Sequence, residues 1–190
     1  MINRIVDKLA FIFVYFEIHY ISKARERYNK RYLLVKSNIK DNVILHGRGT
    51  IHYPDKLTIG SHSRIGDNYF IMAAGGVTIG ENTQISRNVC IYSGNHDYES
   101  STHIPYDDRQ ILKPVTIGNS VWIGMNVNIT PGVNIGDGAI IGMGSTISKD
   151  VPEGAIVVNS AQRIIAVRDI DKFMRLSEQK RFFGKDFPTL

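Results

Sequence analysis

Residues 115–147 read VTIGNS-VWIGMN-VNITPG-VNIGDG-AIIGMG-STI, so that an isoleucine returns at every sixth position. The isoleucines are Ile117, Ile123, Ile129, Ile135, Ile141 and Ile147, and glycine directly follows four of them. A period of six matches neither the 3.6-residue repeat of a helix nor the simple alternation of a long strand. It indicates short strands separated by turns, which return an aliphatic side chain to one interior wall, as in a parallel β-helix.

The same spacing extends toward the N-terminus. Ile59, Ile65 and Ile71 form one set of three steps, and Ile79, Ile85 and Ile91 form the next one after a slip of two residues. Three steps close one triangular coil, so residues 43–152 supply about five coils at the strand spacing of any sheet. Because each coil buries its aliphatic side chains only against its neighbours, we expect a columnar core whose end coils need caps.

One polar insertion interrupts the repeat after Ile91. It spans residues 96–113 and carries His96, His103, Asp107, Asp108 and Arg109. A regular solenoid has no structural need of such a segment, and long loops in compact domains are usually functional or disordered. His96 stands at the root of this loop, where rigid coil gives way to loop, and is therefore the first candidate for chemistry.

The composition of the 190-residue chain indicates one domain with short appendages. The single cysteine, Cys90, cannot form an internal disulfide, and we interpret it as a small buried hydrophobe. We find no signal-peptide pattern and no apolar run long enough to span a bilayer. These features favour a cytoplasmic protein.

The net charge is concentrated in the N-terminal segment. Residues 1–37 hold eight basic and three acidic side chains, which accounts for the whole net charge of +5. The same segment contains the apolar run 9–16, and an apolar helix followed by a basic one could lie on an anionic membrane surface, at its inner face. The interpretation that we favour is a cap on the end coil or a subunit contact. Nucleic acid is not an expected partner, because no binding motif accompanies the basic cluster.

Three stretches resemble the hexapeptide-repeat acetyltransferase family: PVTIGNSVWIG at 114–124, PGVNIGDGAIIG at 131–142 and SKDVP at 148–152. They are most similar to the branch of galactoside, maltose, xenobiotic and polysaccharide O-acetyltransferases. The resemblance implies a left-handed β-helix, a homotrimer, and acetyl-CoA bound between neighbouring subunits. We therefore expect an all-β solenoid over residues 38–160, an N-terminal helical appendage at 1–37 and a C-terminal helical tail at 161–190.

The resemblance also implies roles for particular residues. His96 matches the family histidine that deprotonates the acceptor hydroxyl, a task that suits imidazole because it titrates near neutrality. Asn95, His103 and Asp107 are weaker candidates for acceptor binding or oxyanion stabilisation, and no metal ligand is expected. The residues expected to contact acetyl-CoA are Trp122, Met125, Met143, Ser148, Lys149 and Arg163.

The predicted function is CoA-dependent O-acetyl transfer to a carbohydrate hydroxyl, on a surface polysaccharide or its precursor. Two alternatives stay open at this point. Carbonic-anhydrase-like zinc proteins share the solenoid and need three converging histidines, and His62 could join His96 and His103, although no clean three-ligand spacing is present. The third interpretation is a non-catalytic solenoid that serves as an assembly surface.

Overall fold

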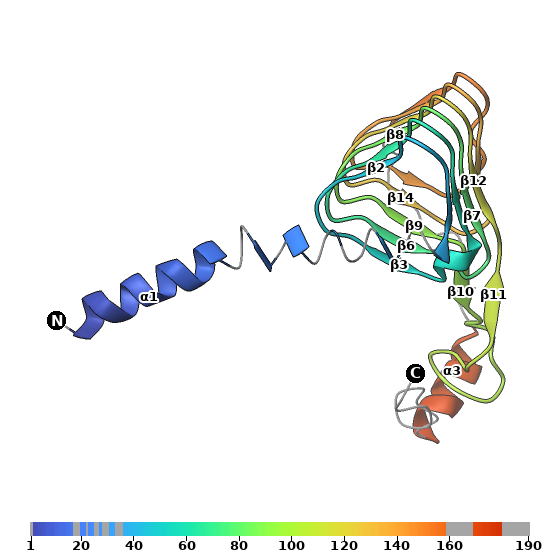
Figure 1. Cartoon of the computed structure of the whole chain (residues 1–190). Helices are drawn as coiled ribbons and strands as arrows, with labels where there is room; N and C mark the ends of the chain where they lie inside the picture. The colour runs from blue at the N-terminus through green and yellow to red at the C-terminus, as the bar shows by residue number, and fades with distance from the viewer. Residues whose placement is uncertain are drawn as a thin grey trace.

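The computed structural model describes residues 2–16, 20–21, 23–24, 27, 31–32, 36–158 and 169–179. Its main body is a column of stacked triangular coils, and each side of the triangle is a parallel sheet (Figure 1). The chain closes five coils and begins a sixth, which confirms the solenoid predicted from the repeat. The first coil begins at Asn38, where a two-residue strand pairs with the coil above.

We name the three sides face A, face B and face C in the order in which the chain visits them. Face A contains β1 (Asn38–Ile39), β4 (Leu57–Ile59), β7 (Val77–Ile79), β12 (Val115–Ile117) and β15 (Asn134–Ile135). Face B contains β2 (Ile44–Leu45), β5 (Arg64–Ile65), β8 (Gln84–Ile85), β13 (Trp122–Ile123), β16 (Ile140–Ile141) and β18 (Ile156–Val157). Face C contains β3 (Thr50–His52), β6 (Phe70–Met72), β9 (Cys90–Tyr92), β14 (Asn128–Ile129) and β17 (Thr146–Ile147). A short 3₁₀ helix, η2 (Pro54–Lys56), connects β3 to β4.

The core consists of isoleucine columns, one behind each face. Strand pairing aligns Ile59, Ile79, Ile117 and Ile135 behind face A, Ile65, Ile85, Ile123 and Ile141 behind face B, and Ile71, Ile91, Ile129 and Ile147 behind face C. All of them are buried. The two-residue slip lies at the corner between faces C and A, where extra chain length changes the turn without shifting the register of the next strand.

Asparagines at the corner between faces B and C show how the turns are specified. Asn68, Asn88 and Asn126 adopt φ values of 58°, 57° and 57°, in the left-handed region that asparagine tolerates better than most residues. Their side chains also bond along the column: Asn68 donates to Asn88 at 3.0 Å and Asn88 donates to Asn126 at 2.9 Å. The corner therefore contributes both turn geometry and contact between coils.

The insertion is a β-hairpin at the corner between faces C and A. Strands β10 (Gly94–His96) and β11 (Gln110–Leu112) pair antiparallel, with Gly94 opposite Leu112 and His96 opposite Gln110. The hairpin stem begins at Gly94, two residues before the expected start of the insertion. The physical reason is that antiparallel pairing extends the ordered stem below His96.

Helices lie outside the column. In Figure 1, α1 (Ile2–Phe16) lies away from the coils, and its side chains from 6 to 16 are all exposed. The described side chains of α1 therefore do not cap the end coil within one chain, and the expectation of a cap or a subunit contact for residues 1–37 stays a prediction. The second helix, α3 (Ile170–Glu178), lies beside the hairpin loop. Within the described residues, no helix combines the length and the apolar character needed to cross a bilayer.

Candidate active site

Hydrogen bonds around Ser93 hold the base of the hairpin against the preceding coil. Ser93 is fully buried; its Oγ donates to the Met72 carbonyl at 2.8 Å and accepts from the Gly75 N–H at 2.9 Å. The Lys113 N–H donates to the Ser93 carbonyl at 2.9 Å and closes the base of the stem. A Cβ atom on Gly75 would lie 2.1 Å from that carbonyl oxygen, so only glycine permits this approach.

His96 is the last residue of β10, and ring packing holds it there. Its imidazole stacks on the ring of Tyr106, which comes from the returning side of the loop, with 3.8 Å between centroids and 11° between planes. The Asn95 side-chain oxygen accepts the His96 N–H at 2.9 Å. The stem therefore fixes the backbone of His96, while Tyr106 restricts its ring.

An ion pair ties the two ends of the loop together. Arg109 Nη2 lies 2.5 Å from Asp97 Oδ2, and the Arg109 N–H donates to Asp107 Oδ1 at 2.9 Å. The pKa of the Asp107 carboxyl is lowered, first by that backbone hydrogen bond and then by the Ser100 hydroxyl. Asp107 therefore acts as a hydrogen-bond acceptor within the loop, which suits a structural role better than proton transfer.

His103 lies farther along the loop than His96. Its Nδ1 is 3.0 Å from the Thr102 hydroxyl, and its backbone N–H donates to Ser100 at 3.2 Å. Neither contact anchors it to the stem, unlike the strand pairing of His96. This difference favours His96 as the chemically competent histidine.

The far side of the loop contacts the C-terminal helix. Lys172 of α3 donates to the Glu99 carbonyl oxygen, and Leu176 on the same helix is buried. Sequence analysis missed this contact, because nothing in the local pattern relates residues so far apart.

The residues expected to bind the cofactor fall on other parts of the column. Trp122 projects from face B with 59% of its surface exposed, between Gln84 and Ile140 on the neighbouring coils. Met125 and Met143 lie at the adjoining corner between faces B and C, where the Met125 carbonyl accepts the Gly144 N–H at 2.9 Å.

Ser148 and Lys149 are exposed and follow β17, at the corner between faces C and A. They share this corner with the hairpin but lie on a later coil. Arg163 lies outside the described residues.

One chain does not bring these groups together. Face B is the side of the triangle opposite the corner from which β10 and β11 emerge (Figure 1). His96 and Trp122 are therefore on opposite sides of the same column, and a site that uses both needs a second copy of the chain.

Sequence analysis also missed an apolar stripe beside Trp122. Ile140 and Ile156 follow it in register along face B, and Ile156 and Val158 are each 70% exposed. A signal was present: the residue before each buried isoleucine points outward and is polar at Asn128 and Asn134, but apolar at Trp122 and Ile140.

The zinc alternative gains no support from the side chains. In the part of the chain that the structure describes, no group of three or more histidine, cysteine, aspartate or glutamate side chains could hold a metal ion. His62 lies at the corner between faces A and B, away from the hairpin that carries His96 and His103.

Comparison with known proteins adds independent findings. The family model for the bacterial transferase hexapeptide (six repeats) matches residues 114–149. The chain is 31% identical over 135 residues to the "Putative colanic acid biosynthesis acetyltransferase WcaF" of Escherichia coli (strain K12), covering 71% of each protein. A maltose O-acetyltransferase from Clostridium difficile 630 superposes with a TM-score of 0.63 at 26% identity, over 74% of each chain. A galactoside acetyltransferase solved in complex with coenzyme A superposes with a TM-score of 0.54 at 32% identity, over 70% of this chain and 66% of that one.

The stacking of Tyr106 on His96 predicts a signature in NMR spectra. An aromatic ring shields nuclei that lie over its face, so Tyr106→Ala should move the His96 ring protons downfield, whereas Tyr106→Phe should leave them near their wild-type positions. Tyr98→Ala, which removes an exposed tyrosine of the same loop, is the matched control. Identical His96 shifts in wild type and Tyr106→Ala would show that the rings do not stack in solution.

Proposed function

The chain belongs to the hexapeptide-repeat acetyltransferase family and is an acyltransferase, and from this premise we propose that it transfers the acetyl group of acetyl-CoA to a carbohydrate hydroxyl. The acceptor that we propose is a surface polysaccharide or its precursor, in line with the name of the Escherichia coli relative. The observation that carries the proposal is His96, held at the root of a hairpin by strand pairing and ring stacking.

His96 would act as the general base. Its imidazole removes the proton of the acceptor hydroxyl while that oxygen attacks the thioester carbonyl, and it returns the proton to the departing thiolate. Proton count and charge therefore balance over the cycle. A fixed ring favours this chemistry, because the base must keep its nitrogen within hydrogen-bond reach of the hydroxyl.

Side chains on and beside face B suit the long arm of acetyl-CoA. Trp122, Ile140, Ile156 and Val158 supply an apolar stripe along the column, and exposed Met143 lies beside it. We propose that the pantetheine arm lies along this stripe, with backbone groups near Met125 and Met143 alongside. Ser148 and Lys149 share the corner of His96, opposite face B, so they would bind the phosphates of a cofactor held on face B of the neighbouring subunit. Together with Arg163 they supply hydroxyl and cationic groups, which suit this role.

We propose that the active unit is a homotrimer in which each site lies between two subunits. The support is geometric, since His96 and Trp122 occupy opposite sides of one column. In a cyclic trimer, the hairpin of one subunit can meet face B of the next, and the contact repeats until the ring closes.

Substitution of His96 tests the mechanism. Alanine should lower kcat by about two to four orders of magnitude, the usual worth of a positioned general base, while calorimetry should show unchanged CoA affinity. His103→Ala is the matched control and should retain most of the activity. If His96→Ala keeps wild-type turnover, the assignment of the base is wrong; if the wild type neither binds CoA nor transfers acetyl groups, the non-catalytic interpretation takes its place.

Mixed trimers test whether the site is shared. His96→Ala and Trp122→Ala should each be impaired, the second most at low acetyl-CoA concentration. When the two variants are co-expressed and purified as mixed trimers, about one in three sites should combine an intact His96 with a neighbour's intact Trp122, because a closed ring of two copies of one variant and one of the other has one such junction. Acetyl transfer should recover accordingly, and no recovery would place both residues of each site in one subunit.

We also propose that α1 lies on an anionic membrane surface, at the inner face of the membrane. The second half of this helix exposes large hydrophobic side chains, including Leu9, Phe11, Ile12, Phe13 and Phe16. A patch of this kind marks an interaction surface, and the basic residues of 1–37 complement anionic lipids.

Vesicle binding separates this surface from a subunit contact. Phosphatidylglycerol vesicles should bind the full chain at low salt, and binding should weaken as salt screens the basic residues. Phe13→Glu should weaken binding at least several-fold, whereas Thr116→Glu, an equal charge change on exposed face A, should not. Two results together would assign α1 to a subunit contact instead: the full chain does not bind these vesicles, and the Phe13→Glu variant loses its oligomeric state.

A further inference from the structure

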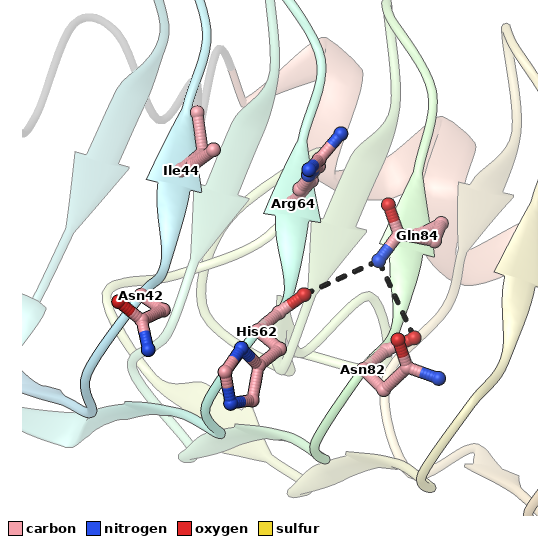
Figure 2. Close-up of a pocket in the computed structure, with 6 residues that line it drawn as sticks. All are labelled: Asn42, Ile44, His62, Arg64, Asn82 and Gln84. Atoms are coloured by element: carbon pink, nitrogen blue, oxygen red, sulfur yellow. Dashed lines mark hydrogen bonds between the residues drawn. The ribbon is translucent and has the colours of Figure 1, made fainter.

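A groove occupies face B on the opposite side of Trp122 from the apolar stripe. Figure 2 shows the residues that line it. It has a volume of about 520 Å³ and belongs to the first three coils. We call it the Arg64 groove; its lining residues are Asn42, Ile44, His62, Arg64, Asn82 and Gln84.

The lining of the Arg64 groove is suited to a negatively charged ligand. It contains one arginine, one histidine and three amide side chains, but no carboxylate. Gln84 turns its amide nitrogen toward the carbonyl oxygens of His62 and Asn82, at 3.3 and 3.4 Å (Figure 2). Glu81 does not line the groove but an adjoining hollow, which shares His62 and Asn82 with it.

Arg64 is exposed, and within the described ranges of the chain its guanidinium makes no ion pair or side-chain hydrogen bond. A guanidinium offers a fork of donors that matches the oxygen atoms of a phosphate. It is therefore available to a ligand.

The groove lies close, along the column, to the coils between which the His96 hairpin emerges. Arg64, Gln84 and Trp122 are in register on successive coils, so Arg64 lies two strand spacings, or ~10 Å, from Trp122. The hairpin that carries His96 leaves between the coil of Gln84 and the coil of Trp122. In a ring of parallel columns, a neighbour's His96 would meet face B at this level. Because the proposed cofactor site occupies the later coils of face B, the first three coils of this face remain accessible to the acceptor.

We propose that the Arg64 groove binds a phosphate or diphosphate group carried by the acceptor sugar. Its place in the reaction rests on the proposed acetyl transfer, whereas anion binding by the groove does not. The chemistry is shared by two sources, a nucleoside diphosphate sugar and a lipid-linked sugar diphosphate. In either case, the sugar spans the distance between the anion at Arg64 and the reacting hydroxyl near His96.

Direct binding tests the groove first. Calorimetric titration with inorganic pyrophosphate at low salt should show binding to the wild type, both alone and with saturating CoA. Arg64→Gln should weaken it by about tenfold to a hundredfold, the usual effect of losing charge-assisted hydrogen bonds. Arg87→Gln is the matched control, because Arg87 is exposed but does not line the groove, and it should bind as the wild type does. Equal binding by Arg64→Gln, or loss of binding when CoA is added, would overturn the proposal.

Acceptor kinetics then test its place in the reaction. A hexose 1-phosphate, a nucleoside diphosphate hexose and a polyprenyl diphosphate hexose should be better acceptors than the free hexose. Arg64→Gln should raise KM for the phosphorylated acceptors at least tenfold and leave KM for the free hexose unchanged. The better of the two diphosphates identifies the source.

The two proposals can fail separately. A wild type that acetylates free and phosphorylated hexoses equally well overturns the acceptor role of the groove while leaving acetyl transfer intact. If the protein binds pyrophosphate through Arg64 but does not bind CoA, the result contradicts the proposed acetyl transfer and supports the anion site.

Discussion

In-register stacking of coils is the constraint on which the rest of this structure depends. Strands of two or three residues have no stability alone, so each must bond to the coil above and the coil below. The isoleucine columns inside and the corner contacts outside reinforce the same register. Close stacking also limits the corners: a Cβ atom on Gly124 would lie 2.6 Å from the Met143 nitrogen, so the coils could not approach as they do.

Stacking turns the outer surface into ordered columns of side chains. On face B, one column carries Arg64 and Gln84 on early coils and Trp122, Ile140 and Ile156 on later ones. The same row of positions is therefore polar at one end and apolar at the other. An anionic group at the early coils and an apolar chain at the later coils would each meet complementary chemistry along this face, and the register sets the distances between their contacts.

The hairpin works differently, because its geometry is local and irregular. Buried Ser93 and the close approach at Gly75 determine where it leaves the column. Tyr106 then orients His96, and the ion pair between Asp97 and Arg109 joins the ends of the loop. A rigid column thus supplies the position of the histidine, while a small set of loop contacts supplies its orientation.

The sequence by itself determined the solenoid, its core isoleucines and the position of His96 at the root of an insertion. These features follow from spacing along the chain, since a six-residue period is short-range information. Only the tertiary structure decided four other features. They are the placement of His96 and Trp122 on opposite sides of the column, the stacking of Tyr106 on His96, the contact of α3 with the loop, and the Arg64 groove. The reason is that contacts between coils join residues at unequal separations: Thr83 bonds to Ser63, 20 residues away, but Asn82 bonds to Ser120, 38 residues away, because the hairpin intervenes. No fixed period encodes such pairs; they exist only once the coils are stacked.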